Sequence, residues 1–347
     1  MIILKVELAQ PCVQAGRRKS VALLNFTLRL HKIFLHTLWK CELPRLEIIK
    51  YHLLVLLATT LVAGSFLASK KLAGIINPFS LTLLRFVGAA LILLPIVLSK
   101  SQWRVKIIST LPRAMVISLF YSAFFIGLFE SLNTTTSLNT GTLFTLVPFI
   151  TALLSIIFFR ENITQKQVFV YLLGAIGTAW VIFGGQLELL SSFSLNKGDL
   201  IFLVAILFMC LYSIAMKFLY RNDEMIVLVF CTLIGGSFWM LLALLFSGQP
   251  LQWNSIQDDS ILHMAYLIVG ATLATAYLYQ ITTIALGPSR VNAYIYLNPI
   301  LIAVLLFIID GVSISTSILP GILISIIATI VLQGRNSNEA TIAAKET

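Results

Sequence analysis

Long apolar stretches separated by short polar connections fill the chain from about residue 51 onward. Each is close to the roughly 20 mostly apolar residues that a helix needs to cross a lipid bilayer. Ten windows meet this description: residues 51–68, 79–99, 114–132, 138–159, 168–184, 200–216, 225–246, 261–283, 291–309 and 315–332. Turn-forming residues fall between windows, as at Gly74, Asn77 and Pro78. The pattern predicts an all-α integral membrane protein with ten transmembrane helices.

Two of these stretches share one layout. Residues 131–162 begin with small hydroxyl and amide side chains, continue as an apolar run and carry Pro148 inside that run. Residues 285–315 have the same order of features, with Pro299 at the corresponding place. Two copies of one layout predict an internal repeat, and repeats in membrane transport proteins usually form the binding site at their interface.

The repeat divides the chain into five parts. We expect a basic N-terminal arm, a first five-helix repeat, a linker, a second five-helix repeat and a tail, at residues 1–50, 51–185, 186–198, 199–333 and 334–347. Because five is odd, the second repeat must enter the membrane from the opposite face. The two repeats are therefore expected to be inverted, an arrangement in which a central site can open alternately to each side.

Composition and charge agree with a membrane location. Hydrophobic residues make up 59% of the chain and charged residues 11%, whereas soluble domains carry roughly 25% charged residues. The net charge of +10 would fit nucleic-acid binding if the basic residues formed one solvated surface. Instead, most of the 24 lysines and arginines fall on the side of the N-terminus, where the positive-inside rule places the cytoplasm. We expect a multi-pass protein of the bacterial inner membrane with both termini cytoplasmic, and no nucleic-acid partner.

The N-terminal arm, residues 1–50, is basic and only moderately apolar. From about Arg18 to Lys40, polar residues recur at three- and four-residue steps, which is typical of an amphipathic helix lying in the membrane interface. Two other interpretations stay open: the arm is disordered, or it precedes the true start of translation. The four cysteines and four histidines of the whole chain lack the spacing of a metal site, so no metal or other cofactor is expected.

Several short motifs follow one another along the windows. They are GSF at 64–66, LRF at 84–86, SLNTGTLFTLVPFITALL at 137–154 followed by Arg160 and Glu161, Gly198 with Asp199, and LGPSRVNAYIYLNP at 286–299. In this order they resemble the EamA-type transporters of the drug/metabolite transporter superfamily, over about residues 50–333. The resemblance implies a secondary transporter that moves a small organic metabolite, amino acid-like or drug-like, by alternating access. It also implies that Ser65 and Tyr212, in the first and sixth windows, face the pore.

Two ionisable residues, Arg85 and Glu130, fall inside the apolar windows. A charge at membrane depth is energetically unfavourable, which makes both residues functional candidates. With the orientation above, both lie toward the outer face, so we hypothesise an ion pair in which Glu130 takes up protons during transport. The alternative is that Arg85 reaches the lipid headgroups and that Glu130 simply ends its helix.

Hydrogen-bonding side chains at membrane depth gather in the fourth and ninth windows, where lipid offers them no partners. At about 100° per residue, those within each window fall on one side of its helix. They are Asn139, Thr142, Thr145, Tyr294 and Asn298. We expect these faces to line the solute cavity; the alternative is that they bond helix to helix.

Pro148 and Pro299 each free a backbone carbonyl one turn earlier, which makes them candidate hinges or plain structural kinks. The chain contains no phosphate-binding glycine loop, no nucleophile elbow and no cluster of His, Asp and Glu at one depth, so no catalytic residue and no enzyme activity are expected. An integral-membrane enzyme and a passive channel remain the alternative functions. The expected partners are a small-molecule substrate and membrane lipid, and a homodimer is one option.

Overall fold

The computed structural model describes residues 48–188, 195–257 and 259–334. The chain forms two compact units, Met1–His52 and Leu53–Thr347. The described part of the first unit is the start of the helix Ile48–Leu72, so the fold presented below is that of the second unit. The predictions for residues 1–47 of the N-terminal arm and for the tail from residue 335 lie outside the described residues.

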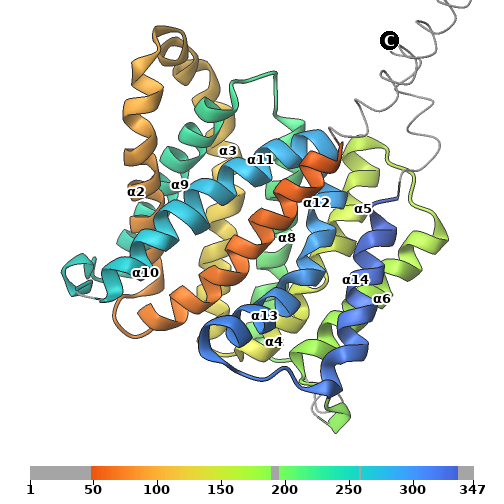
Figure 1. The fold of residues 1–347 in the computed structure, drawn as a ribbon. Helices are drawn as coiled ribbons and strands as arrows, with labels where there is room; N and C mark the ends of the chain where they lie inside the picture. The colour runs from red at the N-terminus through yellow and green to blue at the C-terminus, as the bar shows by residue number, and fades with distance from the viewer. Residues whose placement is uncertain (1–47, 189–194, 258, 335–347) are drawn as a thin grey trace, which may run out of the picture. The chain divides into compact units, whose positions relative to one another are not determined.

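The described residues form helices and no strand (Figure 1). The longer elements are Ile48–Leu72, α2 (Pro78–Ser99), α3 (Ser101–Leu132), α4 (Ser137–Phe144), α5 (Val147–Phe159), α6 (Gln165–Ile182), α8 (Lys197–Phe218), α9 (Met225–Ser247), α10 (Asp259–Ile268), α11 (Thr275–Leu286), α13 (Asn298–Asp310) and α14 (Leu319–Leu332). The short ones are η1 (Trp253–Ser255), η2 (Val269–Ala274), α12 (Pro288–Ala293), η3 (Tyr294–Leu297) and η4 (Thr316–Ile318). A helix satisfies its backbone hydrogen bonds internally, as an apolar segment in lipid must.

Eight helices in the described part of the chain are long and apolar enough to cross a membrane. The helix Thr316–Leu332 is apolar but shorter, and α6 begins with the polar residues Gln165, Lys166 and Gln167. The all-α, multi-pass character expected from the sequence is therefore confirmed. These two segments correspond to the fifth and tenth predicted windows. Because neither is among the eight helices above, the count of ten transmembrane helices stays a prediction.

Helix α3 is longer than the sequence suggested, since it begins at Ser101 and not near residue 114. The expected connection is helical because Trp103, Ile107 and Leu111, spaced four residues apart, pack against the large hydrophobic core of the bundle. Pro112 lies inside this helix without ending it.

The two proline-containing windows are broken helices with matching geometry. Pro148 lies in the first turn of α5 and Pro299 in the first turn of α13, each after a short separate helical segment. The break has a simple cause, since a proline cannot donate to the carbonyl four residues earlier. Both α5 and α13 have 13 residues, and both are followed by a left-handed residue, Arg160 (φ 54°) or Gly311 (φ 67°). The shared layout expected from the sequence is present in the structure, whereas a hinge role for the prolines stays a prediction.

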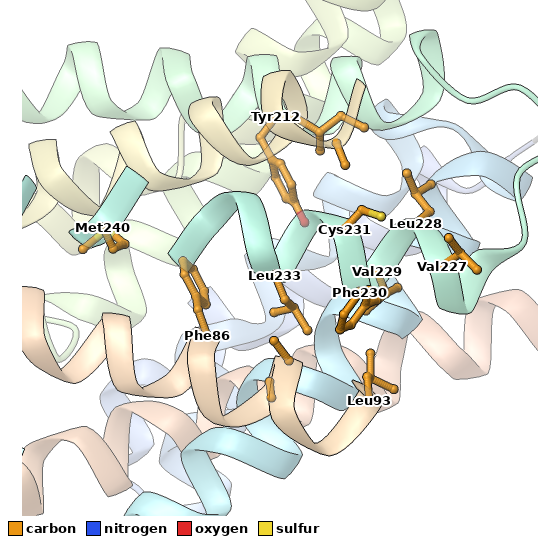
Figure 2. Close-up of a cluster of buried hydrophobic side chains, with 14 of the residues drawn as sticks. Phe86, Leu93, Tyr212, Val227, Leu228, Val229, Phe230, Cys231, Leu233 and Met240 are labelled. Carbon is orange, nitrogen blue, oxygen red and sulfur yellow. The ribbon is translucent and has the colours of Figure 1, made fainter. Parts of the chain in front are cut away.

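Helix α9 lies at the centre of the largest hydrophobic core. Figure 2 shows Phe86 and Leu93 of α2 on one side of α9 and Tyr212 of α8 on the other. Helices α6 and α14 pack together elsewhere in the bundle (Figure 1). They approach closely at Gly177 and Gly321, where a Cβ on Gly321 would lie 2.6 Å from the Gly177 carbonyl oxygen.

Candidate functional site

Arg85 is a buried cation in α2, with 8% of its surface accessible. Its Nε donates a hydrogen bond to Thr272 Oγ1 (2.9 Å), and its Nη2 donates to the Ala271 carbonyl oxygen (3.3 Å). Both acceptors belong to η2, a π-helical turn between α10 and α11. Such wide turns occur frequently at functional sites. The cation thus joins two helices that are far apart in the sequence.

Aromatic rings surround the region next to Arg85. The ring of Tyr121 stacks on Tyr212 and on Phe86, with centroids 4.5 and 5.6 Å apart. Phe125 meets Tyr121 edge-on at 5.0 Å, and the guanidinium carbon of Arg85 lies 6.0 Å from the centre of the Phe125 ring. Stacked and edge-on rings stabilise each other, and a cation near a ring face is attracted to it. These contacts come from α2, α3 and α8.

Polar side chains of α11 complete this region. The hydroxyl of Tyr279 lies 3.4 Å from Thr59 Oγ1 on the first helix. Gln280 Nε2 donates to Thr232 Oγ1 of α9 (3.1 Å), while its Oε1 is buried without a hydrogen-bond partner. Tyr212 lies within electrostatic range of both Tyr279 and Gln280. Hydrogen-bonding groups from several helices therefore converge at one place.

We call the side chains that meet here the central cluster. They are Arg85, Tyr121, Phe125, Tyr212, Tyr279 and Gln280. Tyr121, Phe125 and Tyr279 are only partly buried, although their contacts are with other helices of the bundle. The arrangement can hold a planar organic molecule against the rings while polar groups bond to its substituents.

The expected ion pair between Arg85 and Glu130 is not present. Glu130 is exposed at the end of α3, and its Oε2 accepts a hydrogen bond from Asn133 Nδ2 (3.4 Å). Arg85 bonds to η2 instead, because α2 packs against α9 and the α10–η2 segment, which turns the guanidinium toward them. Within the described residues Arg85 makes no ion pair with any carboxylate.

Asn139 takes part in a polar joint at the start of α8. Its Nδ2 donates to Asp199 Oδ2 (3.0 Å), and the same carboxylate accepts hydrogen bonds from the Thr135 hydroxyl and from the Asn196 N–H (2.8 Å). The Asn196 side chain in turn accepts from the Asp199 N–H, forming a capping box that begins α8. Asp199 is fully enclosed. Asn139 therefore makes a structural contact between the first half of the chain and the start of α8 in the second half.

Two of the expected pore-lining hydroxyls bond within their own helices. Thr145 Oγ1 donates to the Thr142 carbonyl (2.7 Å), and Ser65 Oγ donates to the Val62 carbonyl (2.7 Å). A role for Thr142, Thr145 and Ser65 in binding solute stays a prediction. Tyr212 is the member of the expected set that lies in the central cluster.

The candidates in η3 and α13 are buried. Tyr294 exposes 8% and Asn298 exposes 7% of its surface, and Asn298 Oδ1 is enclosed without a hydrogen-bond partner. Between them in sequence, Tyr296 is fully buried, and its hydroxyl donates to the Tyr171 carbonyl of α6 (2.8 Å). Tyr296 therefore connects helices, whereas solute binding by Tyr294 and Asn298 stays a prediction.

A second buried polar group links both halves of the chain. Asn292 Nδ2 donates to Thr151 Oγ1 (2.8 Å) and lies 3.1 Å from Ser213 Oγ, which itself lies 3.3 Å from Asn292 Oδ1. The three residues belong to α12, α5 and α8. All three are nearly or fully enclosed. This trio fixes the broken ninth window against the fourth and sixth.

A charged contact closes one end of the bundle. Arg113 of α3 binds Asp223 through two hydrogen bonds, Nη1 to Oδ2 at 2.7 Å and Nη2 to Oδ1 at 2.8 Å. Arg113 Nη1 also donates to the Leu219 carbonyl at the end of α8 (3.1 Å). Two parallel bonds between guanidinium and carboxylate form a strong and directional pair. The contact joins α3 to the connection between α8 and α9.

Four residues of the central cluster were not predicted from the sequence: Tyr121, Phe125, Tyr279 and Gln280. Gln280 carried a usable signal, since it is an uncharged polar residue inside a long apolar run, and such residues rarely face lipid. The aromatic residues carried no such signal, because α3 contains several neighbouring ones and nothing in the sequence marks which of them contact other helices. In the described part of the chain, no three His, Cys, Asp or Glu side chains are placed to hold a metal ion.

Known proteins resemble this chain in sequence and in fold. The model of the EamA-like transporter family matches the chain twice, over residues 49–183 and 196–333. The chain belongs to the EamA-like transporter family. A relative of this chain is the "Uncharacterized transporter YyaM" of Bacillus subtilis (strain 168), which is 26% identical over 265 residues, covering 73% of this chain and 84% of the relative.

A protein of known crystal structure has the same fold, with a TM-score of 0.66 at 19% identity over 81% of this chain and 96% of that chain. The family assignment makes this chain a multi-pass membrane transporter. It also places Arg85, Tyr121 and Phe125 in the first matched segment and Tyr212, Tyr279 and Gln280 in the second. Both matched segments therefore contribute to the central cluster.

Proposed function

We propose that this EamA-family protein is a secondary transporter that moves a small organic metabolite across the bacterial inner membrane by alternating access. The observation that carries the proposal is the central cluster, where partly exposed rings and polar groups from both matched segments meet inside an otherwise apolar bundle. An apolar bundle without a transport role has no need to place a cation and hydrogen-bonding groups there, because each is unfavourable in lipid.

The matching breaks at Pro148 and Pro299 support the alternation between two states. Each proline removes one helical hydrogen bond at a point where a short segment meets a 13-residue helix. If the second half is inverted relative to the first, the two breaks are placed symmetrically about the solute site. Bending at one break, with the other straight, would open the site to one side at a time.

The Arg113–Asp223 pair is our candidate for a gate on the side that the positive-inside rule assigns to the cytoplasm. It connects α3, which carries Tyr121 and Phe125, to the connection between α8 and α9. Breaking this pair would free α3 to move away from α8 at that end.

The test is solute counterflow in proteoliposomes that contain the full chain. A panel of radiolabelled amino acids, nucleosides and monocarboxylates is presented outside, and vesicles are preloaded with the same unlabelled compound. A carrier gives saturable uptake that the internal compound accelerates. A passive channel would give uptake that is linear in concentration and unaffected by preloading, and an enzyme would release a chemically changed product. Either result would overturn the proposal.

A matched pair of variants connects the flux to the site. Tyr279→Ala removes a ring and a hydroxyl from the central cluster, so we expect the half-saturation concentration to rise at least tenfold or the flux to disappear. Tyr277→Ala, on the same helix but with 39% of the residue surface exposed, is the control and should transport like the wild type. Equal loss in both variants would contradict the location of the site.

Proton coupling is a separate part of the proposal. Glu130 remains the candidate suggested by the sequence, although it makes no ion pair with Arg85. Uptake of the transported compound is measured with and without an imposed pH gradient, in the wild type and in Glu130→Gln. Loss of the gradient response in the variant would support the role, and an unchanged response would remove it.

A further inference from the structure

The guanidinium of Arg85 has no counter-ion among the described residues. Two ion pairs occur in that part of the chain, Lys106 with Glu224 and Arg113 with Asp223, and neither includes Arg85. A buried cation is unfavourable unless an anion or several hydrogen bonds replace the water that it has lost. The Thr272 hydroxyl and the Ala271 carbonyl supply only part of that replacement.

Two of the free donors of Arg85 point in one direction. An arginine has five N–H donors in a planar fork, and the Nε–H and one Nη2–H, which share the side edge of the fork, are taken by η2. One donor of Nη1 and the second donor of Nη2 remain at the tip, and the other donor of Nη1 points to the opposite side edge. Arg85 keeps 8% of its surface accessible, and no described residue accepts a hydrogen bond from Nη1. The tip of a guanidinium is the edge that binds a carboxylate through two parallel hydrogen bonds.

The surroundings of this tip fit an organic molecule better than an inorganic ion. Phe125 lies beside the guanidinium, and Tyr121 follows it with a ring that stacks on Tyr212. Tyr121 and Phe125 are partly accessible and offer flat apolar surface next to the cation. Chloride would use none of this surface. Arg85 is also the positive charge that the described residues place beside Tyr121, so the site suits a single negative charge.

We propose that Arg85 binds the carboxylate of the transported solute, and that this solute is a monocarboxylate with a planar or aromatic body that packs on Tyr121 and Phe125. The inference rests on the proposed transport function and specifies its substrate class. In this arrangement η2 positions the guanidinium by holding its side edge, and the solute carboxylate completes the hydrogen bonding at its tip.

Binding is tested on the purified full chain in detergent by thermal unfolding, since a ligand of the folded state raises the unfolding temperature. The probes are benzoate, phenylacetate, anthranilate and indole-3-acetate, each compared with its primary amide, and sodium chloride alone. The proteins are the wild type, Arg85→Gln, Arg85→Lys and Arg104→Gln, in which an exposed arginine of α3 receives the same change.

We expect at least one acid to raise the unfolding temperature of the wild type and of Arg104→Gln, while its amide has no effect. Arg85→Gln should need at least tenfold more acid for the same shift. Arg85→Lys should respond more weakly than the wild type, because a lysine keeps the charge and loses the paired donors. If Arg85→Gln does not fold, the comparison of acid with amide in the wild type and in Arg85→Lys still decides the question.

Four results would overturn the inference: an amide that stabilises as well as its acid, an undiminished acid response in Arg85→Gln, the same shift with chloride alone, or no response to any acid. Failure of the transport function looks different. In that case an acid would bind in an Arg85-dependent way, but the proteoliposomes would show no saturable flux of it. Conversely, saturable flux of neutral compounds that the acids do not inhibit would leave transport intact and remove the role of Arg85.

Discussion

The buried trio of Asn292, Thr151 and Ser213 gives a prediction whose size follows from its contacts. Asn292→Ala removes the hydrogen bond to Thr151 at 2.8 Å and the contacts with Ser213 at 3.1 and 3.3 Å. Hydrogen bonds between transmembrane helices contribute about 0.6 kcal/mol on average and at most about 1.7. Because Ser213 can still donate to the Met209 carbonyl (3.4 Å), we expect a loss of about 1–2 kcal/mol of unfolding free energy from the hydrogen bonds.

The measurement is a double-mutant cycle on the full chain in bicelles, with unfolding by dodecyl sulfate followed by tryptophan fluorescence. Thr151→Val removes the hydroxyl and keeps the shape of the side chain. The coupling energy between Asn292→Ala and Thr151→Val should be about 0.6–1.7 kcal/mol. As a control, Thr151→Val is combined with Trp239→Phe, which removes the indole contact with the Met115 carbonyl on α3. Those two changes should add within about 0.5 kcal/mol.

A coupling energy near zero for Asn292 and Thr151 would show that the hydrogen bond between them does not form in the folded protein. Such a result would refute the packing of α12 against α5 described here. A coupling above about 3 kcal/mol would exceed what direct contacts usually give. It would show that the variants disturb the surrounding bundle, so the energy could not be assigned to one hydrogen bond.

Three further predictions concern other contacts. Asp199→Asn weakens a carboxylate that accepts three hydrogen bonds, so we expect about 1–3 kcal/mol lower stability in the same unfolding assay. Gly174→Ala places a Cβ about 2.5 Å from the ring of Tyr296, which is fully enclosed and cannot move aside, so we expect a loss of about 1–3 kcal/mol. Asp223→Asn breaks the paired contact with Arg113 and should change the counterflow rate at least threefold, with a smaller change in half-saturation, because the contact lies away from the solute site.

Each of these variants has a control in the chain. Asp310→Asn changes an exposed carboxylate at the end of α13 and should leave stability within about 0.5 kcal/mol of the wild type. Gly248→Ala is the control for Gly174→Ala. Gly248 has open space around it, so a loss of stability there comes from its left-handed φ of 63° and not from a steric clash. Glu224→Gln breaks the exposed pair with Lys106. If Asp223 belongs to a gate, Glu224→Gln should change the counterflow rate less than Asp223→Asn does. Equal effects at Glu224 and Asp223 would contradict the gate.

Much of the fold could be predicted from the sequence because apolar length leaves few options. A window of about 20 apolar residues in lipid must be helical to satisfy its backbone, and eight of the predicted windows are helices of that kind. The correspondence of Pro148 with Pro299 was also readable, since proline interrupts a helix at a position set by local chemistry. The extent of α3 was not, because its first turns are helical through tertiary contacts of Trp103, Ile107 and Leu111.

The site was harder to predict, as Arg85 and Glu130 show. Both were singled out as charges within apolar windows, but the expected pair between them assumed that shared depth brings side chains together. Depth follows from position along a helix, whereas the direction of a side chain depends on how the helix is rotated against its neighbours. Arg85 faces Thr272, 187 positions later in the chain, and Glu130 bonds locally to Asn133.

The sequence alone therefore determined the helical class, the membrane location, the repeated layout and the family, since these depend on apolar length, turn residues and motifs that are local in the chain. Only the tertiary structure decided which polar groups meet. Helices such as α9 are apolar around their whole circumference, so periodicity does not identify an inward face. The central cluster is assembled from residues on several helices, and its composition is set by packing between segments that are distant in sequence.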